Sequence, residues 1–184
     1  ARTDAAGRKL PAAPRTGRRV FSATAAAQVV DILADSEARA PAFGLWSVLR
    51  LPFAAAVKTG TSEGFRDNWC VGGTREVAVG VWCGNFDRAA MGNVSGVAGA
   101  GAAWREIMLA WAELAHPGED LATVATLAPP PAELARVRVC ALSGLLPGPD
   151  CPATTPELLL PAQRPPAACD WHRRGAGGRT VVAW

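Results

Sequence analysis

The chain has 184 residues, of which 49% are hydrophobic and 19% are charged, and its formal net charge is +3. This composition is typical of a globular protein and argues against intrinsic disorder. The length suffices for one domain, or for one domain and a small second one, and no apolar stretch approaches the ~20 residues of a membrane-spanning helix.

The positive charge is concentrated in residues 1–20, which carry six basic side chains and one acidic one, a net charge of +5 that leaves −2 for the rest. The basic residues have no interleaved aromatic residues and no helical spacing. We therefore interpret 1–20 as a solvated, loop-like leader, with an arm for an anionic polymer as the alternative, and we expect no nucleic-acid binding. The segment lacks the apolar core of a signal peptide.

The first predicted element is a helix that Ser22 or Thr24 can cap and that runs to about Asp35. Pro41 is expected to end any continuation. The predicted apolar stripe of this helix consists of Ala25, Val29, Ile32 and Leu33.

Three antiparallel strands follow in the prediction. Residues 51–61 form a turn and then a buried strand, and residues 67–73 and 77–83 alternate with period two, joined by a short turn at 74–76. With that turn centred near Arg75, Cys70 would face Gly80 and Cys83 would face Asp67. This offset is on the order of 10 Å, too far for a disulfide, so both cysteines are interpreted as small core residues.

The last regular element of this part is an amphipathic helix, whose apolar positions are Trp104, Ile107, Met108, Trp111, Leu114 and Ala115. Its tryptophans are expected in the core rather than in a ligand cage. A helix, three antiparallel strands and a second helix predict the α/β (α+β) class, with the strands packed on helices.

Proline divides the chain, because eleven of the fifteen prolines lie in residues 117–184. We expect a regular part at 21–116, a proline-rich linker at 117–136, and a small, loop-rich module with cysteines at 137–184.

The segment Lys58-Thr59-Gly60-Thr61 carries the clearest chemical signal, because it places a lysine and two hydroxyls on an apolar strand. Such a strand suits an acyl-transfer site that binds a carboxylate-bearing peptide as an added strand. Lys58 would supply positive charge and a route for protons. Thr59 and Thr61 would bind the carboxylate, Gly60 would leave room for the substrate backbone, and the Thr61 N–H would stabilise an oxyanion. The alternative is an edge strand with a solvated lysine.

KTG is the third motif of the serine penicillin-recognising enzymes, beside S-x-x-K and S-D-N. The longer run KTGTSEGFRDNWCVGGTREVAVGVWCGN resembles the end of the transpeptidase domain of class A penicillin-binding proteins. CALSGLLPGPDCP followed by CDWH resembles the start of the C-terminal domain of the 1C type. The resemblance covers about residues 20–184.

This resemblance implies part of a β-lactamase/transpeptidase-like fold and a serine D,D-transpeptidase, an acyltransferase that cross-links peptidoglycan stem peptides and is acylated by β-lactams. It implies a location on the periplasmic side of the bacterial inner membrane and no cofactor. Membrane contact would come only through an N-terminal anchor that these 184 residues do not include, and a glycosyltransferase domain would also lie outside them.

The nucleophile is missing from the sequence. None of the six serines is followed three residues later by lysine or two residues later by asparagine, so S-x-x-K and S-x-N are both absent. Arginine cannot replace that lysine as a base, because it stays protonated. We expect a fragment that begins after the second motif, contributes the KTGT strand, and is inactive by itself.

The remaining cysteines belong to the C-terminal part. A Cys140–Cys151 disulfide is the leading interpretation if the protein is exported, with Cys169 free or as an exchange partner. The alternative is a zinc site of Cys140, Cys151, Cys169 and His172, although the spacing C-x10-C-x17-C-x2-H is irregular. A second function remains open, namely a non-catalytic module at 137–184 that binds cell-wall polymer or a protein partner.

Overall fold

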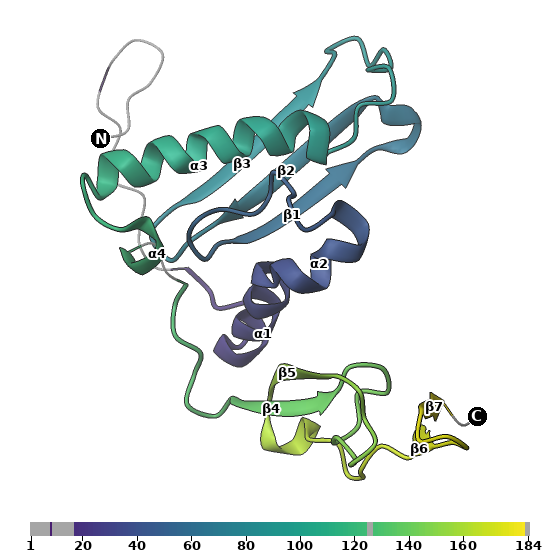
Figure 1. Cartoon of the computed structure of the whole chain (residues 1–184). Helices are drawn as coiled ribbons and strands as arrows, with labels where there is room; N and C mark the ends of the chain where they lie inside the picture. Colours follow the sequence, from purple (N-terminus) through teal and green to yellow (C-terminus); the bar gives the residue numbers. More distant parts are fainter. Residues whose placement is uncertain (1–7, 9–16, 125–126, 183–184) are drawn as a thin grey trace.

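The computed structural model describes residue 8 and residues 17–124 and 127–182 (Figure 1). It opens with helix α1 (Ala23–Ala34), which begins where the sequence predicts, because the Ser22 hydroxyl accepts a hydrogen bond from the Ala25 N–H at 3.0 Å. The predicted apolar stripe, however, is not buried, since Val29 and Ile32 are 54% and 65% exposed.

A second helix, α2 (Ser36–Phe43), follows directly and contradicts the expectation that Pro41 ends the helical segment. The Asp35 carboxylate caps α2 by accepting hydrogen bonds from the N–H groups of Glu37 and Ala38, both at 2.9 Å. Pro41 lies in the last turn, so the helix begins with a strong cap and loses only one backbone hydrogen bond near its end.

The central feature is an antiparallel sheet in the order β1-β2-β3, formed by β1 (Ala56–Thr61), β2 (Asp67–Gly73) and β3 (Ala78–Gly84). The predicted hairpin joins β2 to β3, closed by a hydrogen bond from the Thr74 N–H to the Val77 carbonyl at 3.0 Å. A single turn of 3₁₀ helix, η1 (Glu63–Phe65), connects β1 to β2.

Helix α3 (Ala102–Ala115) lies across the sheet on its inner face, after the short π-helical turn η2 (Val97–Gly101) (Figure 1). Trp104, Met108 and Ala112 are fully buried against the sheet. Ile107 and Leu114, which the sequence stripe includes, are 46% and 84% exposed. The predicted helix is therefore present, but its buried face is rotated away from these two residues.

The core of this part joins α3 and the sheet to the loop before β1. Besides the three residues of α3, its buried members are Leu49, Phe53, Ala55, Val57, Cys70 and Ala100. Helices and antiparallel strands packed in layers, with an open sheet, confirm the predicted α+β class.

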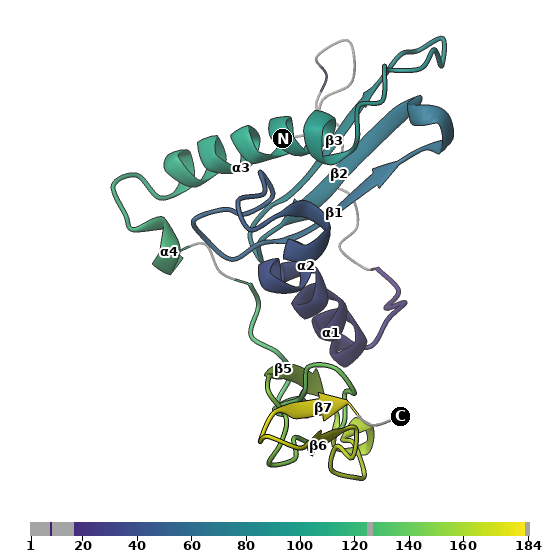
Figure 2. The same ribbon diagram turned by 45° about the vertical axis from the view of Figure 1, so that its right-hand side comes forward.

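The C-terminal part forms a separate small module, which Figures 1 and 2 both place below α1 and away from α3. After α4 (Leu121–Val124), it contains the pair β4 (Ala135–Cys140) and β5 (Thr154–Leu159), the 3₁₀ turn η3 (Pro161–Gln163), and the pair β6 (His172–Arg174) and β7 (Thr180–Val182). The module is rich in loops, as the sequence predicts.

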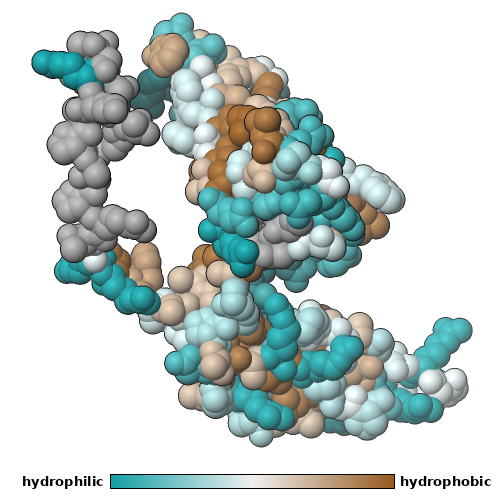
Figure 3. All heavy atoms as spheres, turned by 90° about the vertical axis from the view of Figure 1, so that its left-hand side faces the viewer, coloured by the Kyte–Doolittle hydropathy of each residue, from teal (hydrophilic) through white to brown (hydrophobic). Residues whose placement is uncertain are grey.

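Helix α1 connects the two parts. The Gln28 side-chain amide donates to the Leu158 carbonyl at 2.9 Å, and the Arg136 guanidinium forms a bidentate ion pair with Asp31. The space-filling view shows the sheet part above the C-terminal module, with apolar patches on the side that faces the viewer (Figure 3). Within the described residues, no helix is both long and apolar enough to span a membrane.

Candidate functional site

The KTGT segment forms most of β1, the edge strand of the sheet. Within the described residues β1 pairs only with β2, and the register places Lys58 opposite Val71 and Gly60 opposite Trp69. The other long edge of this strand is therefore not used by the sheet. An edge strand of this kind can accept a further strand through its main-chain groups.

The pleat of β1 divides the motif between two faces. Val57 is 1% exposed and points to the core, so Thr59 and Thr61 share this inner face, while Lys58 and Gly60 lie on the outer face. Gly96 packs beneath the motif, because a Cβ atom placed on it would lie 3.1 Å from the Thr59 Cβ and 2.8 Å from the Gly60 carbonyl oxygen. The lysine and the two hydroxyls can thus approach one ligand only at the free edge.

Lys58 and Gly60 both lie open to solvent. The Lys58 ammonium folds back along its own strand and donates to the Thr59 carbonyl oxygen. A Cβ atom placed on Gly60 would meet no atom within 4 Å, so there is free space above the backbone at this position. The outer face next to them is apolar, since Trp69 and Val71 are 49% and 50% exposed.

Thr61 fixes the end of the strand to the segment that covers it. Its hydroxyl oxygen accepts a hydrogen bond from the Gly96 N–H at 3.0 Å. The hydroxyl hydrogen is not used in this bond, so Thr61 can still donate to a ligand. The predicted carboxylate-binding role therefore stays a prediction with a compatible geometry.

Asn68 is a residue of this region that the sequence argument missed. It is fully buried on β2, where its side-chain oxygen accepts from the Ala100 N–H at 2.9 Å and its amide donates to the Val94 carbonyl at 3.2 Å. These two bonds hold the chain on either side of Gly96 against β2. The sequence contains one signal for this role. Asn68 lies two residues from Cys70 and so shares its inward-facing side of the strand, where a polar side chain needs hydrogen-bond partners.

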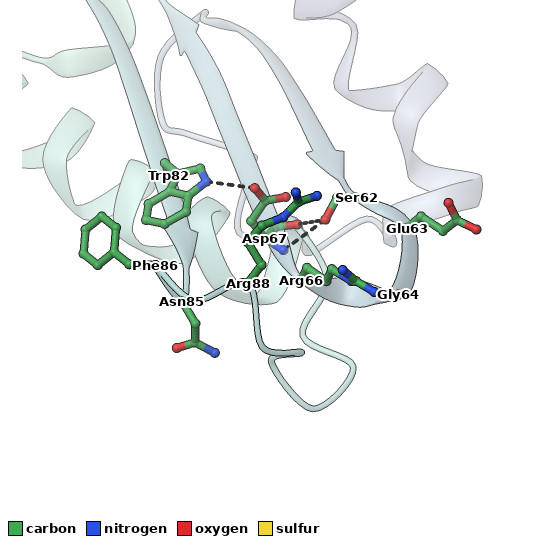
Figure 4. Close-up of a pocket in the computed structure, with 9 residues that line it drawn as sticks. All are labelled: Ser62, Glu63, Gly64, Arg66, Asp67, Trp82, Asn85, Phe86 and Arg88. Atoms are coloured by element: carbon green, nitrogen blue, oxygen red, sulfur yellow. Dashed lines mark hydrogen bonds between the residues drawn. The ribbon is translucent and has the colours of Figure 1, made fainter.

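An open cavity of about 740 Å³ begins at Ser62, directly after the motif (Figure 4). Ser62 and Asp67 are tied together, since the Ser62 hydroxyl donates to the Asp67 carbonyl at 3.1 Å and accepts from the Asp67 N–H at 3.0 Å. The hydroxyl is thus engaged with the backbone of Asp67 and has a structural role at the start of the hairpin.

The Asp67 carboxylate is held in its charged form. Hydrogen bonding to Ser62, the Trp82 indole N–H at 3.2 Å, and the nearby Arg88 guanidinium together lower the pKa of this carboxyl below its ordinary value. The other residues that line the cavity include Glu63, Arg66, Asn85 and Phe86, so charges of both signs surround it.

The structure also brings together the four C-terminal residues proposed as disulfide partners or metal ligands. Cys140, Cys151 and Cys169 surround the Nδ1 atom of His172, and all three thiols are free. No bond joins Cys140 to Cys151 here, so the disulfide stays a prediction. The cluster lies in the C-terminal module, on the far side of α1 from α3 (Figure 2).

The thiols of this cluster differ in acidity. The Ser143 hydroxyl, which donates to the Cys169 sulfur at 3.2 Å, lowers the pKa of Cys169 to about 7, and burial raises the pKa of Cys151 to about 11. Burial opposes ionisation of Cys140, but hydrogen bonds from Ser143 and from the Leu142 N–H lower its pKa. By contrast, burial raises the pKa of Cys70 in the sheet to about 11.

No protein-family model and no curated protein matches this sequence. Among solved structures, the chain is similar to penicillin-binding protein 1A from Haemophilus influenzae, with a TM-score of 0.49 and 21% sequence identity over 62% of this chain. The chain spans 16% of that protein's length. At this level the likeness concerns the chain trace alone.

Proposed function

We propose that this chain contributes the KTGT substrate-binding strand of a serine D,D-transpeptidase that cross-links peptidoglycan stem peptides and reacts with β-lactams. The observation that supports this most directly is the position of Lys58 and Gly60 on an edge strand, with open space above Gly60. A peptide substrate could add to that edge as an antiparallel strand through the main-chain groups of β1.

Each residue of the motif has a distinct part in this proposal. Lys58 places its positive charge on the outer side of the added peptide, where it attracts a carboxylate and favours proton transfer near the serine. Thr59 and Thr61 approach the same edge from the inner side with hydroxyls that can donate to a carboxylate. The Thr61 N–H would bind the oxyanion that forms when the serine oxygen attacks the stem-peptide carbonyl.

The reaction needs a serine that this sequence does not provide in an S-x-x-K context, so that residue must come from another segment. In the proposed reaction the serine oxygen forms an ester with the stem peptide as the leaving amine departs. The amine of a second stem peptide then displaces the serine and forms the new peptide bond. In this proposal the site lies on the periplasmic side of the bacterial inner membrane.

A fluorescent penicillin tests this function. The complete protein encoded by the gene should be labelled covalently, and Lys58→Ala should slow the labelling by about 100-fold or more if the ammonium assists proton transfer. The matched control is Lys9→Ala, because Lys9 is the other lysine of the chain and lies outside the motif. Equal losses in both variants would contradict the assigned role of Lys58.

The chain alone provides a second readout. Because it lacks S-x-x-K, the 184-residue chain should retain no penicillin after denaturation. A label that survives denaturation, or a complete gene product without S-x-x-K and S-x-N, would overturn the proposal and favour a non-catalytic module.

A further inference from the structure

The C-terminal module contains three sulfur atoms arranged around one nitrogen atom. The Nδ1 atom of His172 lies 3.6 Å from the Cys140 sulfur, 3.5 Å from the Cys151 sulfur and 3.3 Å from the Cys169 sulfur. All four atoms lie within 4.8 Å of one another. The fold therefore brings together ligand atoms from residues that are up to 32 positions apart in the sequence.

The three sulfur–nitrogen distances match the corresponding edges of a tetrahedron around a zinc ion. With Zn–S bonds of about 2.3 Å and a Zn–N bond of about 2.05 Å at tetrahedral angles, a sulfur and a nitrogen ligand lie about 3.6 Å apart. The three distances from Nδ1 lie between 3.3 and 3.6 Å. Each sulfur is thus as far from the imidazole nitrogen as in a tetrahedral zinc site.

Other partners cannot satisfy this arrangement. A ring nitrogen carries either one proton or one lone pair, so His172 Nδ1 can form a good hydrogen bond with only one of the three sulfurs. A disulfide would bring two sulfurs to about 2.05 Å and would leave the third sulfur and the imidazole without a common partner. A single cation placed among them engages all four atoms at once.

We propose that Cys140, Cys151, Cys169 and His172 bind one Zn²⁺ ion that holds the C-terminal module together. Three thiolates and one imidazole form a set of ligands typical of structural zinc sites. Four protein ligands fill a tetrahedral shell and leave no open position for substrate. The site is also enclosed, since Cys140, Cys169 and His172 are 1%, 8% and 7% exposed.

The backbone around the cluster supports this assignment. The Gly148 N–H donates to the Cys151 sulfur at 3.3 Å, and the Ser143 hydroxyl donates to the Cys169 sulfur at 3.2 Å. Donors aimed at sulfur stabilise a metal-bound thiolate and fix its orientation. Gly144, with a φ of +72°, turns the chain after Cys140 and donates its N–H to the Cys140 carbonyl at 3.0 Å.

The module needs such a link because its own core is small. Its described buried hydrophobic residues are Leu134, Val139, Cys140, Leu158 and Cys169. The pairs β4-β5 and β6-β7 form separate two-stranded sheets, which are marginal by themselves. The four ligands lie at the end of β4, in the following loop, before β6 and at its first residue, so one ion would join both sheets.

The decisive measurement is the metal content of the full chain, purified under reducing conditions without chelator. We expect one zinc ion per chain. Replacing zinc with Co²⁺ should give the visible d–d bands of a tetrahedral site and a sulfur-to-cobalt charge-transfer band. A reduced wild-type chain that binds neither ion when each is supplied, or a freshly isolated chain with a Cys140–Cys151 disulfide, would overturn the proposal.

Variants assign the ligands. Cys169→Ser and His172→Ala should each lose the stoichiometric zinc, whereas His172→Cys should retain it, because a fourth thiolate can complete the tetrahedron. The matched control is Cys83→Ser, which removes a thiol of the sheet and should keep one zinc per chain. Full zinc content in Cys169→Ser would contradict the site.

Hydrogen exchange separates a structural ion from one bound at the surface. A chelator added to the wild-type chain should abolish amide protection in residues 135–182 and leave β1, β2 and β3 protected. Unchanged protection in 135–182 after zinc removal would contradict the structural role. This test depends neither on a variant that folds nor on transpeptidase activity.

Discussion

Asn68 has the most demanding environment of the residues near the KTGT strand, because its buried amide has two backbone partners. We predict that Asn68→Ala lowers the free energy of unfolding by about 2–4 kcal/mol, since it leaves the Ala100 N–H and the Val94 carbonyl without partners. Denaturant unfolding measures this. Asn85→Ala is the control, because Asn85 is exposed, and its loss should stay below about 1 kcal/mol.

Asp67 gives a prediction about pH. Its pKa is lower in the folded protein than in the unfolded chain, so the charged carboxylate contributes stability above pH ~4, and that contribution is lost as the pH falls through the folded pKa. Ser62→Ala should raise the pKa of Asp67 in an NMR titration. Ser95→Ala should leave it unchanged, and an unchanged pKa in Ser62→Ala would contradict the contribution of Ser62 to the low pKa of Asp67.

At the residue scale the sequence shows where a motif lies better than which partners its neighbours find. KTGT is a local pattern, so its strand and its lysine could be located directly. Asn68 depends on Ala100 and Val94, which lie about 30 positions away along the chain, and no local pattern indicates such partners. The same holds for the three sulfurs around His172, which converge through loops of irregular length.

Among the elements, Gly72 of the sheet is surrounded by very close neighbours. A Cβ atom on Gly72 would lie 2.3 Å from the Ala56 carbonyl oxygen and 2.9 Å from both the Val57 Cα and the Trp104 ring. We predict that Gly72→Ala destabilises the fold by about 3 kcal/mol, because two of these neighbours are backbone atoms that cannot move aside.

Gly80→Ala in β3 is the matched control. A Cβ atom there would meet only a Val71 methyl at 3.8 Å, an ordinary contact, so this change should alter stability by less than about 1 kcal/mol. Thermal unfolding of the two variants side by side makes the comparison. A similar loss in both would indicate that glycine is needed for backbone flexibility and not for close packing.

The elements themselves were largely predictable, but their register and buried faces were not. The hairpin was expected to place Cys70 opposite Gly80, whereas Cys70 faces Val81 and Cys83 faces Asn68. The turn contains four residues, 74–77, one more than expected, and this shifts the pairing by one. Cys70 and Cys83 therefore share the inner face. The buried face of α3 also differs from the predicted apolar stripe, because packing against the sheet determines which side of the helix is buried.

At the scale of the whole molecule, the Gln28–Leu158 hydrogen bond and the Arg136–Asp31 ion pair join the two parts. We predict that Arg136→Gln combined with Gln28→Ala changes the unfolding free energy of the sheet part by less than about 1 kcal/mol, because the Arg136 side chain of the ion pair with Asp31 is 55% exposed and solvent screens the pair. Hydrogen exchange in β1, β2 and β3 measures this. A larger loss would mean that the module supports the sheet through α1.

The proposed boundaries at this scale remain predictions. The expected linker at 117–136 contains the short helix α4, and β4 already begins at Ala135, so regular structure extends into both of its ends. The proline content indicated where the sheet part gives way to the loop-rich module. It could not show which residues of 117–136 would form helix or strand.

The exposed indole of Trp69 has a practical consequence. It lies opposite Gly60 on the outer face, next to the open space at the sheet edge, and it is half exposed. A peptide or drug bound along Lys58 and Gly60 would cover this ring and change the polarity around it. Intrinsic fluorescence, compared between the chain and its Trp69→Phe variant, would then report occupancy of the strand in real time and without a label.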